Sequence, residues 1–164
     1  MNLASLSQYS KHKDGTYVSY QMDEHTRALL DNFVEMNLGL AERVAASTYH
    51  ITVIYSRTPV PAAEDYSGRS TAVANAVCYE VFPTKDGDKC LVLRINSAEA
   101  STLNNHLVKL GATSDYDEYK PHVTIAYNSE MPEDLSTLPL PQFPLVFDRI
   151  EVEPLDPLYV PSNN

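Results

Sequence analysis

YHITVIY at residues 49–55 and PHVTIAY at residues 121–127 are two copies of one pattern. Each copy has a histidine, an apolar residue, a threonine, two apolar residues and a tyrosine. Runs of β-branched and aromatic residues such as these predict strands. Because side chains at positions i and i+2 of a strand point the same way, His50 and Thr52 are expected to share one face. The same spacing places His122 and Thr124 together on the second strand.

The two polar pairs are expected to share a function. A single histidine on a strand is usually a structural residue, but two copies with matching threonines are hard to attribute to coincidence. A polar group without a partner in an apolar strand costs roughly 1–3 kcal/mol, so both pairs should face a common wet cleft. An imidazole can serve as base or acid near neutral pH, and a hydroxyl can stabilise developing charge on a phosphate. The pattern predicts a catalytic site made of His50, Thr52, His122 and Thr124.

The flanking sequence predicts an α+β fold. Working outward, we expect strands over residues 15–22, 50–55, 71–82, 89–96, 121–127 and within 143–154, with a hairpin turn at Asp86-Gly87. Two helices are expected, one capped by Asp23 and running to Asn37, and one capped by Ser97 and ended by Gly111. Residues 57–69 and the acidic-aromatic segment 114–119 are predicted loops, the second being a solvated turn or a lid over the site.

Composition narrows the function classes. The 164 residues fit one domain, 1–164, in which residues 1–14 form a loose arm with a solvated His12. Twelve basic against 22 acidic residues give a net charge of −10, which disfavours binding of a long nucleic acid. No apolar run reaches the ~20 residues that span a bilayer, and the N-terminus lacks a secretory apolar core. The sequence therefore predicts a cytoplasmic protein with no membrane partner.

The duplicated motif resembles the 2H phosphoesterase superfamily, which is named for two H-x-[ST]-hydrophobic motifs in two pseudo-symmetric lobes. The resemblance implies a single bilobal domain, with two small antiparallel sheets and outer helices around a central cleft. It also implies a phosphodiesterase that needs no metal and no cofactor. Within the superfamily, GTYVSYQMDEHTRALL (15–30), YKPHVTIAY (119–127) and EPLDPLY (153–159) resemble the phage anti-CBASS cyclic-oligonucleotide phosphodiesterases.

That family resemblance implies a substrate and further site residues. The substrate would be a cyclic di- or trinucleotide messenger of bacterial defence, such as cyclic GMP–AMP, cleaved at a 3′–5′ linkage so that a phage evades CBASS immunity. Tyr17 would stack on a base, or else pack under the adjacent helix. Glu153 and Tyr159 match family positions that hold the nucleotide, although the family aromatic is often tryptophan, which this chain lacks. Lys120 would meet a phosphate, or else be an ordinary solvated lysine.

Two alternatives remain open from the sequence. One is a 2′,3′-cyclic phosphodiesterase that acts on RNA ends or on small cyclic phosphates. The other is a nucleotide-binding module without catalysis. The presence of both intact His/Thr pairs argues against this second alternative. Protein partners, oligomeric state, base preference, and the division of base and acid roles between the histidines are not specified by the sequence.

Overall fold

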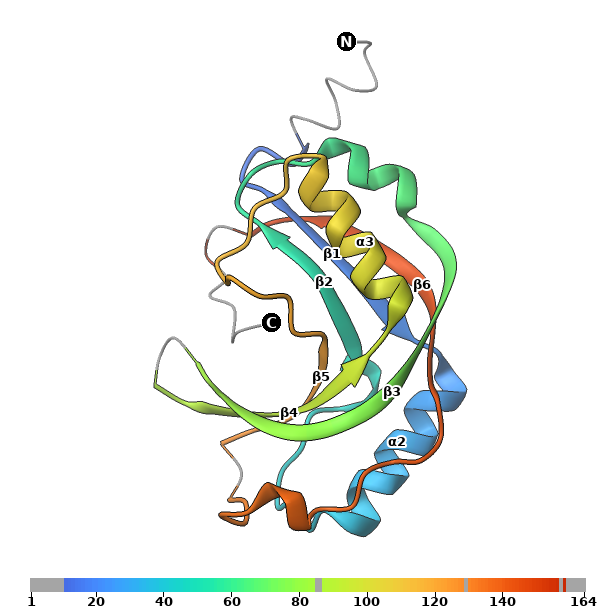
Figure 1. Ribbon diagram of the computed structural model, residues 1–164, viewed down its shortest axis with the longest axis vertical. Helices are drawn as coiled ribbons and strands as arrows, with labels where there is room; N and C mark the ends of the chain where they lie inside the picture. The colour runs from blue at the N-terminus through green and yellow to red at the C-terminus, as the bar shows by residue number, and fades with distance from the viewer. Residues whose placement is uncertain (1–10, 85–86, 129, 157, 159–164) are drawn as a thin grey trace.

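The strands and helices follow the order that the sequence predicts. The computed structural model describes residues 11–84, 87–128, 130–156 and 158 (Figure 1). Its strands are β1 (Thr16–Met22), β2 (His50–Ser56), β3 (Gly68–Pro83), β4 (Lys89–Asn96), β5 (His122–Tyr127) and β6 (Leu145–Pro154). Its α-helices are α2 (Glu24–Asn37) and α3 (Ala98–Lys109), and short 3₁₀ turns are η1 (Ala46–Thr48), η2 (Pro61–Tyr66) and η3 (Leu135–Thr137).

The strands form two antiparallel lobes that share β3. The strand order is β2-β1-β6-β3-β4-β5. The first part of β3, from Gly68 to Ala74, pairs with β6, and the part from Asn75 to Pro83 pairs with β4. The long, curved β3 thereby bends the strands round, so that the edge strands β2 and β5 contact each other (Figure 1). The predicted α+β fold is confirmed, but the two predicted small sheets are joined through β3 into one six-stranded sheet, whose two edge strands carry the two motifs.

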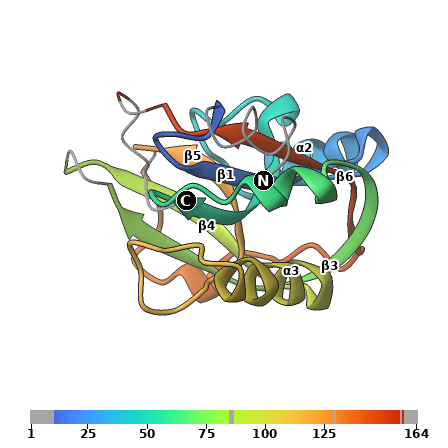
Figure 2. The same ribbon diagram turned by 90° about the horizontal axis from the view of Figure 1, so that it is seen from above.

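The two helices lie on opposite sides of the strands (Figure 2). Asp23 caps α2 by accepting a hydrogen bond from the Thr26 amide, and Ser97 caps α3 by accepting one from the Ala100 amide, as predicted. Helix α3 packs against β2 and β3, whereas α2 packs against β6. Among the described residues, no helix combines the length and the apolar character needed to cross a bilayer.

The core lies between the sheets and these helices. Ile51 and Val53 of β2 and Val123 and Ile125 of β5 are fully buried, so the apolar positions of both motifs belong to the core. The largest fully buried side chains around them are Tyr49, Phe147, Met22, Leu30, Leu91, Leu93, Ile95, Leu107 and Leu145. Burying such side chains contributes roughly 1.5–3 kcal/mol each, which anchors the backbone of both motifs.

Two sequence predictions need correction. His12 is completely buried and its Nε2 lies 2.8 Å from Glu64 Oε1, so it is not solvated and residue 12 does not belong to a loose arm. Residues 1–10 of that predicted arm lie outside the described residues. The predicted loop 57–69 contains η2, because Pro61 fits the first turn of a helix, and β3 begins earlier than predicted, at Gly68.

We expect Gly15→Ala to destabilise the fold strongly. Gly15 has φ +128°, and a Cβ there would lie 2.1 Å from the Ser56 carbonyl oxygen. The backbone conformation alone costs an L-residue about 1–3 kcal/mol, and the clash adds to it. Urea unfolding should show a larger loss of unfolding free energy than for Gly68→Ala, which has φ +118° but open space around its Cβ. Equal losses in the two variants would contradict the role of the clash.

Candidate active site

The two motif histidines make the same hydrogen bond. His50 Nδ1 lies 2.6 Å from the carbonyl oxygen of Thr48, and His122 Nδ1 lies 2.7 Å from that of Lys120. A carbonyl oxygen can only accept, so Nδ1 carries the proton in both rings. In the neutral state Nε2 is therefore the acceptor nitrogen of each ring. Each imidazole is oriented by a backbone carbonyl two residues before it, so either ring can act as base or acid.

Tyr17 connects the histidine and the threonine of the first motif. Its hydroxyl lies 3.0 Å from His50 Nε2 and 2.8 Å from Thr52 Oγ1. Because Nε2 is the acceptor nitrogen, the Tyr17 hydroxyl donates to it and is free to accept from the Thr52 hydroxyl. The predicted pairing of His50 with Thr52 on one face is confirmed by this shared partner. Tyr17 is brought there because β1 pairs with β2.

The second motif has a more enclosed surrounding. His122 and Thr124 are both buried, with 7% and 9% of their surface exposed. The ring of Phe82 from β3 meets the His122 ring edge-on, with centroids 4.9 Å apart. The Cys90 thiol of β4 lies 3.8 Å from Thr124 Oγ1 and donates to it, and burial raises the pKa of that thiol. The thiol therefore stays protonated.

Each motif ends in a one-residue shift of strand register. In β2 the shift leaves Val53 without a partner on β1, and in β5 it leaves Ile125 without a partner on β4. Such a bulge adds one residue to one strand and changes which face the following side chains occupy. Tyr55, three residues after Thr52, consequently lies on the histidine face, where its ring meets that of Tyr17.

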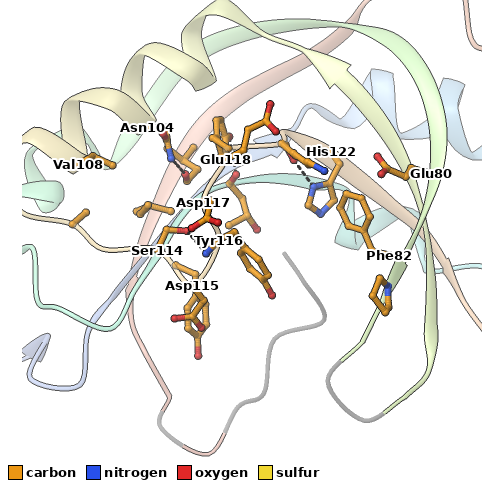
Figure 3. A pocket seen from close by; sticks show the side chains of 18 of the residues that line it. Glu80, Phe82, Asn104, Val108, Ser114, Asp115, Tyr116, Asp117, Glu118 and His122 are labelled. Carbon is orange, nitrogen blue, oxygen red and sulfur yellow. Dashed lines mark hydrogen bonds between the residues drawn. The ribbon is translucent and has the colours of Figure 1, made fainter.

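A cavity of about 770 Å³ lies beside the motifs. In Figure 3, His122, Phe82 and Glu80 stand on one side of it, Asn104 and Val108 of α3 stand on the other, and the loop before β5 lies between them. The cavity is lined by residues 52–55, 80–83, 104, 108, 112, 114–120 and 122. Its volume is within the range of small-molecule sites, which is roughly 300–1,000 Å³.

Burial and charge act in opposite directions on His50. Burial is the main cause that lowers the pKa of His50 below 6.5, and Arg27 acts the same way. The hydrogen bond to Thr48 and the carboxylates of Glu151 and Glu153 raise this pKa but do not outweigh burial. His50 is therefore held mainly neutral near pH 7, which is the protonation state of a general base.

The predicted binding residues are distributed as follows. Lys120 is exposed and lines the cavity, and its carbonyl orients His122. Glu153 on β6 is exposed and lies directly across from Tyr17. Tyr17 is half-buried, with its ring edge-on to that of Tyr55. Tyr159 lies outside the described residues.

Several site residues were missed by the sequence analysis. Phe82 could not be placed on His122 because their contact depends on the pairing of β4 with both β3 and β5. The loop 114–119, which the sequence offered as a turn or a lid, lines the cavity, but the three hydrogen bonds that Asp115 accepts from the Arg57 guanidinium were not predicted. Asn104 is buried on α3, and Tyr119 donates to the Thr52 carbonyl. A polar residue on the apolar face of α3 was the one available signal, since Asn104 falls among Ala100, Leu103 and Leu107.

Metal-ligating side chains do not gather in the part of the chain that the structure describes. Among these residues, no group of three or more histidine, cysteine, aspartate or glutamate side chains could hold a metal ion.

Solved structures share this fold. A structure described as a phosphoesterase superposes with a TM-score of 0.51 and 14% sequence identity, covering 86% of this chain and 94% of its own. Escherichia coli LigT complexed with 3′-AMP superposes with a TM-score of 0.51 and 14% identity, covering 84% of each chain. At this low identity the likeness shows the fold, which is that of the 2H phosphoesterases.

Sequence relatives identify the family. The family model described as "Anti-CBASS protein Acb1" matches residues 14–160. Anti-CBASS protein Acb1 of Salmonella phage S16 is 33% identical over 150 residues, which cover 92% of this chain and 94% of that protein. The protein of the same name from Enterobacteria phage T4 has the same identity and coverage. The chain belongs to the Acb1 family of anti-CBASS proteins.

Proposed function

We propose that this chain is a phosphodiesterase that opens 3′–5′ linkages of cyclic di- or trinucleotide messengers, such as cyclic GMP–AMP, and so protects a phage from CBASS immunity. The observation that carries the proposal is the pair of matched histidines, each with Nδ1 on a backbone carbonyl and each followed by a threonine. Membership of the Acb1 family supports the anti-CBASS role. The fold shared with the 2H phosphoesterases supports the chemistry.

His50 is the general base in this proposal. Its lowered pKa keeps Nε2 unprotonated, so Nε2 accepts the proton of a ribose 2′-OH. In the free protein the Tyr17 hydroxyl occupies the hydrogen-bonding position at Nε2 that the substrate hydroxyl takes. The 2′-oxygen attacks the adjacent 3′-phosphorus, and the bond from phosphorus to the 5′-oxygen of the next nucleotide breaks.

His122 is the general acid, and the threonines bind the phosphate. As an imidazolium, His122 gives the Nε2 proton to the departing 5′-oxygen, so the product is linear and ends in a 2′,3′-cyclic phosphate. Thr52 and Thr124 donate hydrogen bonds to the non-bridging oxygens, where negative charge increases in the transition state. In this proposal Lys120 meets a phosphate, which is supported by its position at the cavity. Tyr17 and Glu153 hold a base, which is supported by their pairing across β1 and β6. No step uses a metal or a cofactor.

The test is incubation of the protein with cyclic di- and trinucleotides in EDTA, beside an RNA ending in a 2′,3′-cyclic phosphate, followed by mass spectrometry. The expected result is loss of a cyclic nucleotide and appearance of a linear isomer of the same mass. Opening of the RNA end alone, with a gain of one water, would replace the proposal with a 2′,3′-cyclic phosphodiesterase. Activity that EDTA abolishes would contradict metal independence. No change in any substrate would favour a binding module.

The base assignment predicts the acid limb of the pH profile. Because the pKa of His50 lies below 6.5, kcat/KM should stay high as the pH falls to 6.5 and should drop only below it, where His50 takes up a proton. Glu151 is the carboxylate that raises this pKa most, so Glu151→Gln should move the limb to still lower pH. Profiles of kcat/KM from pH 4.5 to 8 for the wild type and for Glu151→Gln measure the position of this limb and its shift. A limb above pH 6.5, or a shift upward in Glu151→Gln, would contradict the assignment.

A further inference from the structure

The bulge that ends the first motif leaves two carbonyl groups of β2 to be satisfied by side chains. The Thr52 carbonyl accepts a hydrogen bond of 2.8 Å from the Tyr119 hydroxyl. The next carbonyl, that of Val53, accepts one of 2.8 Å from Asn104 Nδ2. β2 is an edge strand of the sheet that the described residues form, and on this side the two donors are side chains. Without these two side chains, buried carbonyls beside the catalytic pair would lack partners.

Both donors come from the other half of the molecule. Asn104 lies on α3, and Tyr119 lies three residues before His122, in the segment that leads into the second motif. The reverse connection also exists, since the carbonyl of the second bulge residue, Ile125, accepts from the backbone amide of Val44 at 2.9 Å. Val44 lies in the segment that leads into the first motif. Each motif's bulge is thus held by the approach to the other motif.

We propose that Tyr119 and Asn104 are positioning residues that hold the bulge after Thr52. They thereby fix the direction in which the side chains of His50 and Thr52 point relative to His122. The inference rests on the proposed function for its kinetic test. The hydroxyl of Tyr119 suits this role because burial raises its pKa, so it stays protonated and able to donate near neutral pH. Asn104, with 8% of its surface exposed, has no solvent to replace its contact.

The structure offers a matched control for Tyr119. Tyr79 is a buried tyrosine whose hydroxyl, like that of the half-buried Tyr119, donates to a backbone carbonyl, here that of Pro139 at 2.9 Å. Burial raises the pKa of Tyr79 as well, and its side chain does not line the cavity. Tyr119→Phe and Tyr79→Phe therefore each remove one buried hydroxyl and leave one carbonyl without its donor. They differ in whether that carbonyl belongs to the catalytic strand.

The kinetic test compares these two variants with the wild type on the cyclic nucleotide that it cleaves. We expect Tyr119→Phe to lower kcat by about tenfold or more, with KM within twofold, since small misplacements of catalytic groups cost about 10²-fold. Tyr79→Phe should shift the urea midpoint by a similar amount and leave kcat within twofold of the wild type. Asn104→Leu should also lower kcat, and the double variant should lose less than the product of the single losses, because both side chains hold one bulge. Equal kcat in the two tyrosine variants would overturn the inference.

A second readout separates this inference from the proposed function. The titration of His50, followed by the NMR signal of its ring proton in the protein without substrate, should move in Tyr119→Phe and stay in place in Tyr79→Phe. This measurement needs no turnover. If the wild type cleaves nothing, the proposed function fails, and the His50 titration still decides the positioning role. An unchanged His50 titration in Tyr119→Phe would overturn the inference whatever the activity.

Discussion

His122→Ala is expected to lower kcat for a cyclic dinucleotide by about 10²–10⁴-fold, the usual contribution of one proton-transfer group. Its ring is buried against Phe82, with Nδ1 fixed on the Lys120 carbonyl, so Nε2 is held in one direction. Removing the ring leaves the 5′-oxygen to depart without a proton. The control is His106→Ala, because His106 is an exposed residue of α3 that does not line the cavity. Circular dichroism and urea unfolding check that both variants are folded.

The acid role is tested by changing the leaving group. A nucleoside 3′-(4-nitrophenyl phosphate) keeps the attacking 2′-OH but releases a nitrophenolate, which leaves well without protonation. His122→Ala should therefore recover most of its lost rate on this substrate, relative to the wild type. A loss of the same size on both substrates would show that His122 is not the acid. Full activity of His122→Ala on the cyclic dinucleotide would contradict the two-histidine mechanism altogether.

The positions of the catalytic strands could be predicted because the patterns that indicate them lie within a few consecutive residues. The spacing of His50 and Thr52, and of His122 and Thr124, follows directly from strand alternation, and the caps Asp23 and Ser97 follow from side-chain hydrogen bonding at helix starts. These features depend on a few consecutive residues. They could be predicted without knowing which strands pair.

The rest of the site depends on pairing and could not be predicted. The contact of Phe82 with His122 needs three strands in one register, and the bulges at Val53 and Ile125 appear only when β1 pairs with β2 and β4 with β5. His12 was misjudged for the same reason. Its polar neighbours in the sequence suggested solvent, but its partner Glu64 is brought to it from η2.

The two motifs have the same local structure, which explains why the base and acid roles of their histidines cannot be inferred from the motif sequences. Both histidines have the same tautomer and the same orienting bond, so the motif itself treats them alike. Their surroundings differ. His50 has the Tyr17 hydroxyl at Nε2 and the carboxylates of β6 nearby, whereas His122 has the aromatic edge of Phe82. The proposed division of base and acid roles rests on this difference between the lobes.

His50→Ala is expected to lower kcat by about 10²–10⁴-fold on the cyclic dinucleotide and by a similar factor on the nitrophenyl ester. The reason is that activation of the 2′-OH is needed whichever group leaves, so a better leaving group cannot replace the base. His25→Ala is the control, since His25 is exposed on α2. Tyr17→Phe keeps the base and should be affected far less than His50→Ala on both substrates.

The two substrates together decide the direction of proton transfer. If His50 is the base and His122 the acid, only His122→Ala recovers its rate on the nitrophenyl ester. The decrease of kcat/KM below pH 6.5 that the wild type shows should then be absent from His50→Ala and present in His122→Ala. The reverse pattern, with recovery in His50→Ala, would exchange the two roles while leaving the two-histidine mechanism in place. Because both rings have Nδ1 on a carbonyl, the structure permits that exchange, and it is the lowered pKa of His50 that selects the first arrangement.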